Sequence, residues 1–335
     1  MTMQIAVVGA GSWGTTVAAL AVRNCPTVLW ARRAEVADEV NEVHTNASYL
    51  SGFDLPGELE ATASLERAVA GADVLVMAVP SQGFRAVLEE AAGSVRPWVP
   101  VVSLSKGLEQ GTRKRMTEVV NDVLPGHPAG VLTGTNLAKE VMAGHPAAAV
   151  MAMADERVAL ALQPVFATDS FRVYTNLDIV GCELAGALKN VMAIAAGMVD
   201  GMGFGDNTKA TMMTRGLAEL TRLGVALGGD PFTFPGLAGM GDLVATCSSS
   251  QSRNHHVGAE LGKGRAIDEI IAEMNMVAEG VKSSRVVCEL GREHGVEMPI
   301  ADEVEAVCHR GRTAIEALTN LMQRQQRAEL HGLVR

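Results

Sequence analysis

Residues 3–14 read MQIAVVGAGSWG, a short apolar segment that leads directly into three regularly spaced glycines. The continuous apolar run at residues 5–8 predicts a parallel strand that is buried on both faces. Gly9, Gly11 and Gly14 then fit the G-x-G-x-x-G pattern. In that pattern the first glycine allows a tight turn, the second lets the backbone approach a pyrophosphate, and the third permits close helix–strand packing. We therefore predict a strand–turn–helix that binds a dinucleotide.

The next expected strand, residues 27–33 (TVLWARR), ends in Arg32 and Arg33. A fold specific for NAD usually places an acidic residue here, which binds the ribose 2′-hydroxyl. Guanidinium groups instead pair with a 2′-phosphate and stack on adenine. We therefore expect NADP to be accepted alongside NAD, the alternative being an exposed basic turn without a ligand.

The length and charge of the chain restrict its class. A chain of 335 residues is long enough for two domains. Its formal net charge of −10 argues against nucleic acid or an anionic membrane as partner. No stretch approaches 18 consecutive apolar residues without a charge or a glycine, and no charged segment precedes an apolar one at the N-terminus. We expect a cytoplasmic protein with a small-molecule substrate and no membrane insertion.

The cysteines and histidines do not form a metal-binding pattern. The five cysteines are odd in number and far apart, and no two form a C-x-x-C pair, which suits reduced thiols better than disulfides or a zinc site. His255 and His256 are adjacent, so on a helix they point in different directions. We expect no metal site.

The pattern of apolar residues predicts two domains with different secondary structure. Up to about residue 180 apolar runs alternate with helical stretches, which predicts an α/β fold with an N-terminal Rossmann-type doubly wound sheet. The expected strands are residues 5–8, 27–33, 72–80, 99–107 and 130–135, with 147–153 and 171–174 extending the sheet. From residue 181 onward the spacing is helical. The expected helical stretches are residues 183–198, 208–227, 266–274 and 301–322.

The predicted architecture is thus a dinucleotide-binding domain at 1–180 and an all-helical substrate and catalytic domain at 181–335. The ligand of such a sheet lies beyond the carboxyl ends of the strands, where Lys106 and Gly134 follow two of the apolar runs. Long apolar helices in the second domain can bury a face against a second copy, so we expect a homodimer.

Lys189 is the candidate proton donor. It is the only charged residue in the segment GALKNVMAIAAG at 186–197. Lysine is seldom fully buried without a partner, and burial would bring its pKa toward neutrality, where it works as both acid and base. The alternative is a lysine that faces solvent on a polar stripe.

A second group of candidates follows the glycine-rich segment PGLAGMGDLVATC at 235–247. Gly239 and Gly241 are expected to hold a special turn that delivers Asp242 to a helix start, with Thr246 one turn later on the same face. The alternative for this aspartate is a helix cap.

A cluster of hydrogen-bond donors follows at residues 248–256, SSSQSRNHH. It includes Ser252, Arg253 and Asn254, and the guanidinium offers bidentate geometry. Such a cluster in an acidic protein suits a substrate phosphate or carboxylate.

The order of these segments resembles that of a known family, the NAD(P)-dependent glycerol-3-phosphate dehydrogenases. The resemblance looks closest to the bacterial form and covers essentially the whole chain. The segments that carry it are GAGSWG at 9–14, NASYL at 46–50, SKG at 105–107, GALKN at 186–190, FPGLAGMGDL at 234–243, SQSRN at 250–254 and VAEGVK at 277–282.

The resemblance implies roles for individual residues and a reaction. Lys189 matches the family's proton donor and acceptor, and Arg253 and Asn254 match positions that hold the substrate phosphate. The positions around the glycerol hydroxyls and the reacting carbonyl are Lys106, Asn190, Asp242 and Thr246. The implied cofactor contacts are Ser12, Trp13, Arg32, Arg33, Tyr49, Lys106, Ala138, Arg253, Val277 and Glu279. The implied reaction is the reversible reduction of dihydroxyacetone phosphate to sn-glycerol 3-phosphate, which feeds glycerophospholipid synthesis.

One departure from the family lies near Gly134 and Asn136, both of which we expect to bind substrate. Thr135 stands where the family commonly has proline, which frees φ and adds a backbone donor. We expect this change to alter substrate affinity more than reaction type.

Two other functions remain open at this point. One is a related two-domain dehydrogenase of β-hydroxy acids or sugar phosphates, which also uses a lysine on the first helix of its second domain. The other is a dinucleotide-binding sensor without catalysis. Asp242 together with Arg253 and Asn254 favours the glycerol-phosphate enzyme over both.

Overall fold

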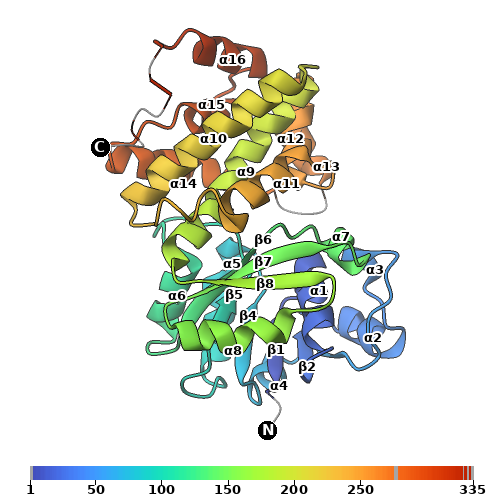
Figure 1. The fold of residues 1–335 in the computed structure, drawn as a ribbon. Helices are drawn as coiled ribbons and strands as arrows, with labels where there is room; N and C mark the ends of the chain where they lie inside the picture. Colours follow the sequence, from blue (N-terminus) through green and yellow to red (C-terminus); the bar gives the residue numbers. More distant parts are fainter. Residues whose placement is uncertain (1–2, 275–277, 327, 330–331, 333–335) are drawn as a thin grey trace. The chain divides into compact units, whose positions relative to one another are not determined.

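The computed structural model describes residues 3–274, 278–326, 328–329 and 332. The chain divides into two compact units (Figure 1). The first, the sheet unit, comprises residues 1–105 and 114–179, and the second, the helical unit, comprises residues 106–113 and 180–335. Residues 106–113 thus group with the helical unit although they precede the predicted boundary at residue 180, and the Lys106 oxygen accepts a hydrogen bond from Asn190 there.

The sheet unit contains an eight-stranded sheet in the order β3-β2-β1-β4-β5-β6-β7-β8. Its strands are β1 (Ile5–Val8), β2 (Thr27–Trp30), β3 (Glu60–Thr62), β4 (Val74–Met77), β5 (Val101–Ser103), β6 (Ala129–Gly134), β7 (Ala147–Met153) and β8 (Phe171–Asn176). Chain order reverses between β1 and β4, the switch point at which open α/β sheets bind ligands. The glycine turn after β1 therefore lies at this switch point.

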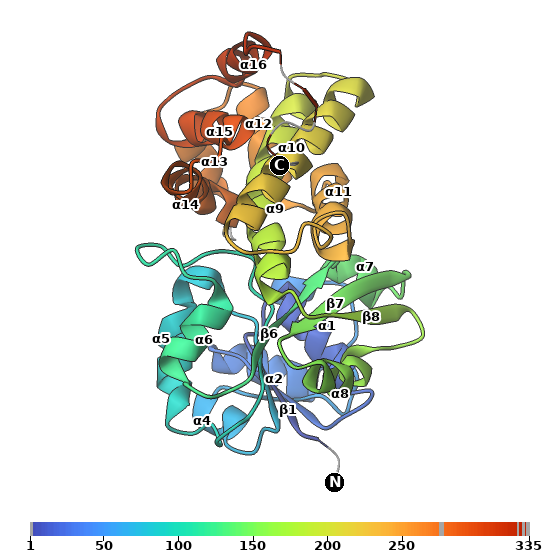
Figure 2. The same cartoon turned by 60° about the vertical axis from the view of Figure 1, so that its left-hand side comes forward.

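Helices cover both faces of this sheet, and alternate residues of β1 supply both cores. Ala6 and Val8 face one side and Ile5 and Val7 the other. Figure 2 shows α4, α5 and α6 on the first side and α1 and α8 on the second. The helices of this unit are α1 (Ser12–Ala21), α2 (Ala34–Glu42), α3 (Ala47–Leu50), α4 (Leu65–Val69), α5 (Ser81–Ala92), α6 (Met116–Val123), α7 (Ala138–Met142) and α8 (Glu156–Phe166).

The doubly wound sheet agrees with the sequence prediction, with two differences. The edge strand β3 was not expected, because its three residues are too few to form an apolar run. All observed pairs are parallel except β6 with β7, which is antiparallel. An apolar run indicates that a strand is buried but carries no information on its direction.

The helical unit contains no strand among its described residues. Its elements are α9 (Ile179–Gly201), α10 (Asp206–Ala226), the π-helical turn η1 (Leu237–Gly241), α11 (Asp242–Ser248), α12 (Arg253–Gly262), α13 (Ile267–Glu273), α14 (Glu279–Glu293), α15 (Pro299–His309) and α16 (Ala314–Met322). The expected stretch at 301–322 is two helices, because Gly311 takes a left-handed φ of +71° between them.

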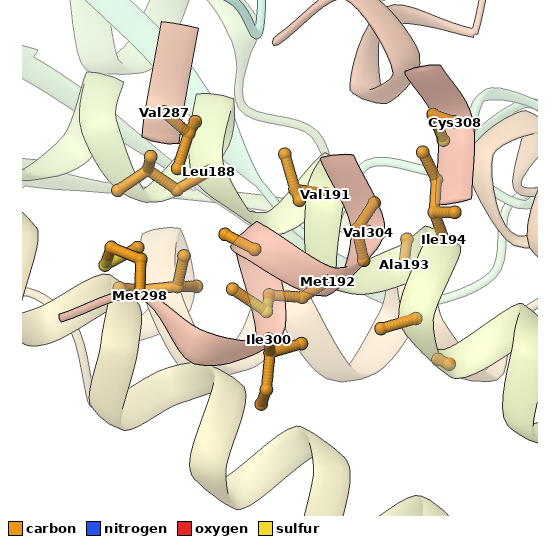
Figure 3. Close-up of a cluster of buried hydrophobic side chains, with 14 of the residues drawn as sticks. Leu188, Val191, Met192, Ala193, Ile194, Val287, Met298, Ile300, Val304 and Cys308 are labelled. Atoms are coloured by element: carbon orange, nitrogen blue, oxygen red, sulfur yellow. The ribbon is translucent and has the colours of Figure 1, made fainter. Parts of the chain in front are cut away.

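The long helix α9 forms the centre of the helical unit. Figure 3 shows Leu188, Val191 and Met192 of α9 among side chains of α14 and α15 and the segment before α15. By length and composition α9 is able to span a membrane, but 89% of its most apolar window is buried within the protein. Such burial is typical of the central helix of a folded domain.

Candidate functional site

The glycine turn after β1 has the geometry of a dinucleotide cradle. Gly9 has a φ of +122°, and a Cβ there would lie 2.7 Å from the carbonyl oxygen of Ala78. A Cβ on Gly14 would lie 2.0 Å from the Gly9 oxygen, whereas one on Gly11 would meet no described atom within 4 Å. The first and third glycines are thus required by packing, and the second leaves open space beside the N-terminus of α1. That opening fits a pyrophosphate.

Hydrogen bonds fasten the next segment to this turn. The amide of Asn46 donates to the oxygen of Ala10 and to Oγ1 of Thr15, each at 2.9 Å, and Ser12 Oγ donates to the Tyr49 oxygen at 2.6 Å. The guanidinium of Arg33 lies 5.6 Å from the centre of the Tyr49 ring, in a cation–π contact. This buried anchoring role of Asn46 was not predicted, since no local pattern in the sequence shows its partner 31 residues away.

Several polar atoms of the sheet unit are buried without a hydrogen-bond partner among the described residues. They include Trp13 Nε1 and both amide atoms of Asn136. Buried polar groups are normally paired, so these atoms fit a bound ligand that would pair them. Thr135 donates to the Ala148 oxygen at 2.9 Å, so the hydroxyl that replaces the family's proline is itself anchored.

The other expected cofactor positions of this unit lie at the edges of elements. Arg32 and Arg33 are exposed after β2, and Ala138 is the first residue of α7. Gly134, which is expected to bind substrate, ends β6 with a φ of +135°.

The helical unit contains a cluster of two lysines and an aspartate, in which Lys189 and Asp242 are buried and Lys106 is partly exposed. Lys189 is only 5% exposed, and its Nζ donates to Oδ1 of Asp242 and to Oγ1 of Thr246. Lys106 Nζ donates to the other carboxylate oxygen of Asp242 at 2.7 Å. The alternative of a solvent-facing Lys189 is therefore wrong. Asp242 is not merely a helix cap either, because its carboxylate binds two ammonium groups.

The surroundings of Lys189 change its acidity. Burial lowers the pKa of Lys189 from 10.5 to about 8, and the positive charge of Lys106 also lowers it, while Asp242 partly restores it. An ammonium group with a pKa near neutrality both gives and takes protons efficiently. The cluster is thus suited to general acid–base chemistry.

The π-helical turn η1 explains how Asp242 reaches Lys189. A Cβ on Gly239 would lie 2.0 Å from the Phe234 oxygen, so only glycine permits this turn. Asp242 begins α11 directly after it, and Thr246 follows one turn later. Gly241 has an ordinary helical φ of −58°, so the expectation that it too is needed for the turn is not supported.

A chain of amide hydrogen bonds extends from this cluster to α12 and α14. Asn190 donates to the Lys106 oxygen at 2.9 Å, and Asn254 donates to Asn190 Oδ1 at 3.0 Å. The amide oxygen of Asn254 accepts the N–H of Gly280, next to Glu279 at the start of α14. Arg253 is exposed at the first position of α12.

Two further residues, Ser252 and Val277, are also predicted to bind substrate or cofactor. Ser252 Oγ accepts the N–H of His255 at 3.2 Å, so this serine is the N-cap of α12. Val277 lies outside the described residues.

One polar group near α12 was not predicted. His255 Nε2 lies 2.8 Å from Oδ2 of Asp200 on α9, and Lys209 of α10 donates to Oδ1 at 2.7 Å. The sequence pattern places His255 only in the donor cluster at 248–256 and makes it a poor metal ligand. Among the described residues, no group of three or more His, Cys, Asp or Glu side chains suited to a metal is found. Local sequence patterns could not reveal the contact between Asp200 and His255, because the two residues are 55 positions apart.

One unit has a glycine-rich turn suited to a dinucleotide, and the other has a buried lysine whose pKa is lowered. The two features together are typical of two-domain nicotinamide-dependent dehydrogenases. Two family models match within this class. The model for the NAD-dependent glycerol-3-phosphate dehydrogenase N-terminus matches residues 4–159, and the C-terminal model matches residues 178–319. The chain belongs to the NAD-dependent glycerol-3-phosphate dehydrogenase family.

Individual relatives agree with this assignment. A protein of Sphingopyxis alaskensis named NAD(P)+ glycerol-3-phosphate dehydrogenase 2 is 60% identical over 331 residues, which are 99% of each chain. A Mycobacterium avium protein with the same enzyme name is 55% identical over 98% of this chain and 97% of its own. The crystal structure of glycerol-3-phosphate dehydrogenase from Coxiella burnetii has a TM-score of 0.92 at 35% identity, covering 96% of this chain and 99% of that one.

Proposed function

We propose that this chain catalyses the reversible reduction of dihydroxyacetone phosphate to sn-glycerol 3-phosphate with NADPH or NADH. The observation that carries this proposal is the cluster in which buried Lys189, Asp242 and Thr246 are joined by the partly exposed Lys106. When bound, the nicotinamide supplies the hydride for reduction or accepts it for oxidation.

Lys189 is the proton donor in this proposal. Its ammonium group stabilises the negative charge that develops on the substrate carbonyl oxygen and then protonates that oxygen. In the reverse direction the neutral amine takes the proton from the hydroxyl group. Asp242 holds Lys189 in place, and burial, helped by the positive charge of Lys106, keeps the pKa of Lys189 low enough for both steps.

The start of α12 binds the substrate phosphate in this proposal. Arg253 provides a guanidinium at the first helical position, and the N-terminus of a helix favours an anion. Each bond that Asn190 and Asn254 donate uses one of the two N–H groups of the amide, so each side chain has a second N–H to offer. Phosphate binding remote from the carbonyl orients the reacting carbon.

The sheet unit binds the dinucleotide. The opening over Gly11 and the N-terminus of α1 take the pyrophosphate, and Arg33 with Tyr49 contacts the adenosine end. Arg32 and Arg33 favour the 2′-phosphate of NADP without excluding NAD. Trp13 offers the dinucleotide a buried N–H group without a partner among the described residues, and the unpaired amide atoms of Asn136 are offered to the substrate.

The product, glycerol phosphate, would serve as the backbone for glycerophospholipid synthesis in the cytoplasm, and we propose that the enzyme acts as a homodimer. A dehydrogenase of β-hydroxy acids or other sugar phosphates is not favoured, because both glycerol-3-phosphate dehydrogenase models match the chain.

The test is loss of reduced-nicotinamide absorbance when the purified protein is mixed with dihydroxyacetone phosphate and NADPH, and then NADH. Rapid oxidation is expected with both, and a fall in the NADPH-to-NADH rate ratio in an Arg32→Ala, Arg33→Ala variant would assign the arginines to the 2′-phosphate. A folded protein that binds NADPH but oxidises neither cofactor would contradict the proposal.

A further inference from the structure

Helices α9 and α12 cross with their backbones in contact. A Cβ on Gly197 of α9 would lie 2.0 Å from the His255 oxygen, and one on Gly258 of α12 would lie 2.0 Å from the Ile194 oxygen. The same holds one turn further along, where a Cβ on Gly201 would lie 2.1 Å from the Ala259 oxygen and one on Gly262 would lie 2.5 Å from the Met198 oxygen. These four glycines, here called the glycine crossing, leave no room for any side chain.

A polar contact fixes the same crossing from the side. Asp200 of α9 binds His255 of α12 at 2.8 Å and also accepts from Lys209 of α10. His255 is directly in sequence with Asn254, whose amide bonds to Asn190. The two helices are therefore joined at the crossing and again at their asparagines.

The crossing joins the two halves of the proposed substrate site. Lys189 lies on α9 eight residues before Gly197, or about 12 Å along the helix axis. Arg253 and Asn254 begin α12, and Gly258 follows within about one turn. A change in the separation of the helices at the crossing would therefore move the phosphate-binding end of α12 relative to the proton donor.

We propose that the glycine crossing, with the Asp200–His255 contact, is a positioning device that sets the distance between Lys189 and the phosphate-binding end of α12. Through that distance it selects a substrate whose carbonyl and phosphate have the spacing of a triose phosphate. This inference rests on the proposed function, because it takes Lys189 and Arg253 as the two ends of the substrate. The positioning residues act through α12 and do not themselves touch the substrate.

The direct test is Gly258→Ala, which forces α12 away from α9. We expect the KM for dihydroxyacetone phosphate to rise about tenfold or more, since a misplacement near 1 Å is costly in a preorganised site. The KM for NADPH should stay unchanged. The kcat/KM for dihydroxyacetone, which has no phosphate, should change far less, so the preference for the phosphorylated substrate falls.

A milder variant covers the case in which Gly258→Ala does not fold, as judged by circular dichroism. Asp200→Asn keeps the side-chain size but weakens the contact with His255, and we expect a rise of about threefold in the KM for dihydroxyacetone phosphate only. Two matched controls should leave both substrates unaffected. Gly216→Ala places its Cβ 3.1 Å from the flexible Met192 side chain, and Lys209→Met removes the other partner of Asp200.

The outcomes separate this inference from the proposed function. If the wild-type enzyme does not oxidise NADPH with dihydroxyacetone phosphate, the function itself fails. If it does, and Arg253→Ala raises the KM for that substrate while Asp200→Asn and any folded Gly258→Ala leave it unchanged, only the positioning device is overturned. Equal losses with dihydroxyacetone and its phosphate would likewise overturn it, because they would show a general structural effect.

Discussion

The two units bury different kinds of polar residue. In the described part of the chain, the buried charged side chains are Glu183, Lys189, Glu219 and Asp242, and all lie in the helical unit. The buried polar side chains of the sheet unit, such as Thr15, Asn46 and Ser103, are uncharged. The buried part of the proposed cofactor site in the sheet unit thus consists of backbone and neutral groups, with charge at the exposed Arg32 and Arg33, while the buried charged groups lie in the helical unit.

The units also differ in the sequence separation of the residues that form their proposed sites. The glycine turn is built within residues 9–14, so its geometry is local. The lysine cluster joins Asp242 to Lys189 across 53 residues and to Lys106 across 136. If the sheet unit binds the cofactor and the helical unit transfers the proton, a substitution in one unit should abolish one of these activities and leave the other intact.

The largest effect is expected for Lys189→Met, which keeps the approximate length of the side chain and removes the ammonium group that donates the proton. Loss of a general acid typically costs two to four orders of magnitude, so kcat should fall about 10³-fold. The affinity for NADPH, measured by fluorescence titration, should be unchanged because the cradle is in the sheet unit. Loss of NADPH binding in this variant would break the division between the units.

The converse change is Gly11→Ala, which places a methyl group in the open space of the cradle. The variant should fold normally, but one or two charge-assisted hydrogen bonds to the pyrophosphate would be weakened, so the Kd for NADPH should rise roughly 10- to 100-fold. The kcat at saturating NADPH should change little. Gly83→Ala on α5, where a Cβ also meets no described atom within 4 Å, is the matched control and should bind NADPH normally.

The pH dependence of turnover should report on the helical unit alone. With a pKa of about 8, Lys189 loses its proton as pH rises, so reduction should fall about tenfold per pH unit above that value. Oxidation of glycerol 3-phosphate needs the neutral amine and should instead rise up to about pH 8. Rates that fall together with rising pH in both directions would contradict the role of Lys189.

Lys106→Met sharpens the same measurement. The positive charge of Lys106 lowers the pKa of Lys189, so its removal should move the descending limb of the reduction profile to higher pH. A limb that stays in place in this variant would mean that another group titrates.

Sequence patterns predicted the features that arise from local chemistry. The strand–turn–helix at residues 3–14 follows from glycine spacing, and α9, α10, α13, α15 and α16 follow from apolar periodicity, whereas α12 and α14 lie outside the expected helical stretches. Lys189 was identifiable because it is a single charge in an apolar segment. The direction of β7, the anchoring by Asn46 and the Asp200–His255 contact were not predictable, since each depends on a partner distant in sequence. The resemblance named Asp242 and Lys106, but only the structure shows that both lysines share one carboxylate.

The smallest expected effect concerns Glu219, one of the buried charged groups that distinguish the helical unit from the sheet unit. Its carboxyl group accepts the N–H groups of Ile300 and Ala301 at the start of α15. Burial raises the pKa of Glu219 from 4.5 to about 8, although these two hydrogen bonds partly oppose the shift. Between those values the folded state keeps a proton that the unfolded state releases. The stability that this group contributes is therefore present below about pH 4.5 and is lost as pH rises through about 8.

A Glu219→Gln variant removes this titration and should show a flatter dependence of unfolding temperature on pH. One pKa unit corresponds to about 1.4 kcal/mol, or roughly 3–6 °C for a domain of this size, so between pH 5 and 8 the two slopes should differ by at most about that much per pH unit. Glu289→Gln, an exposed change on α14, is the control and should leave the slope unaltered. A variant slope equal to that of the wild type would mean that Glu219 does not contribute to the pH dependence of stability.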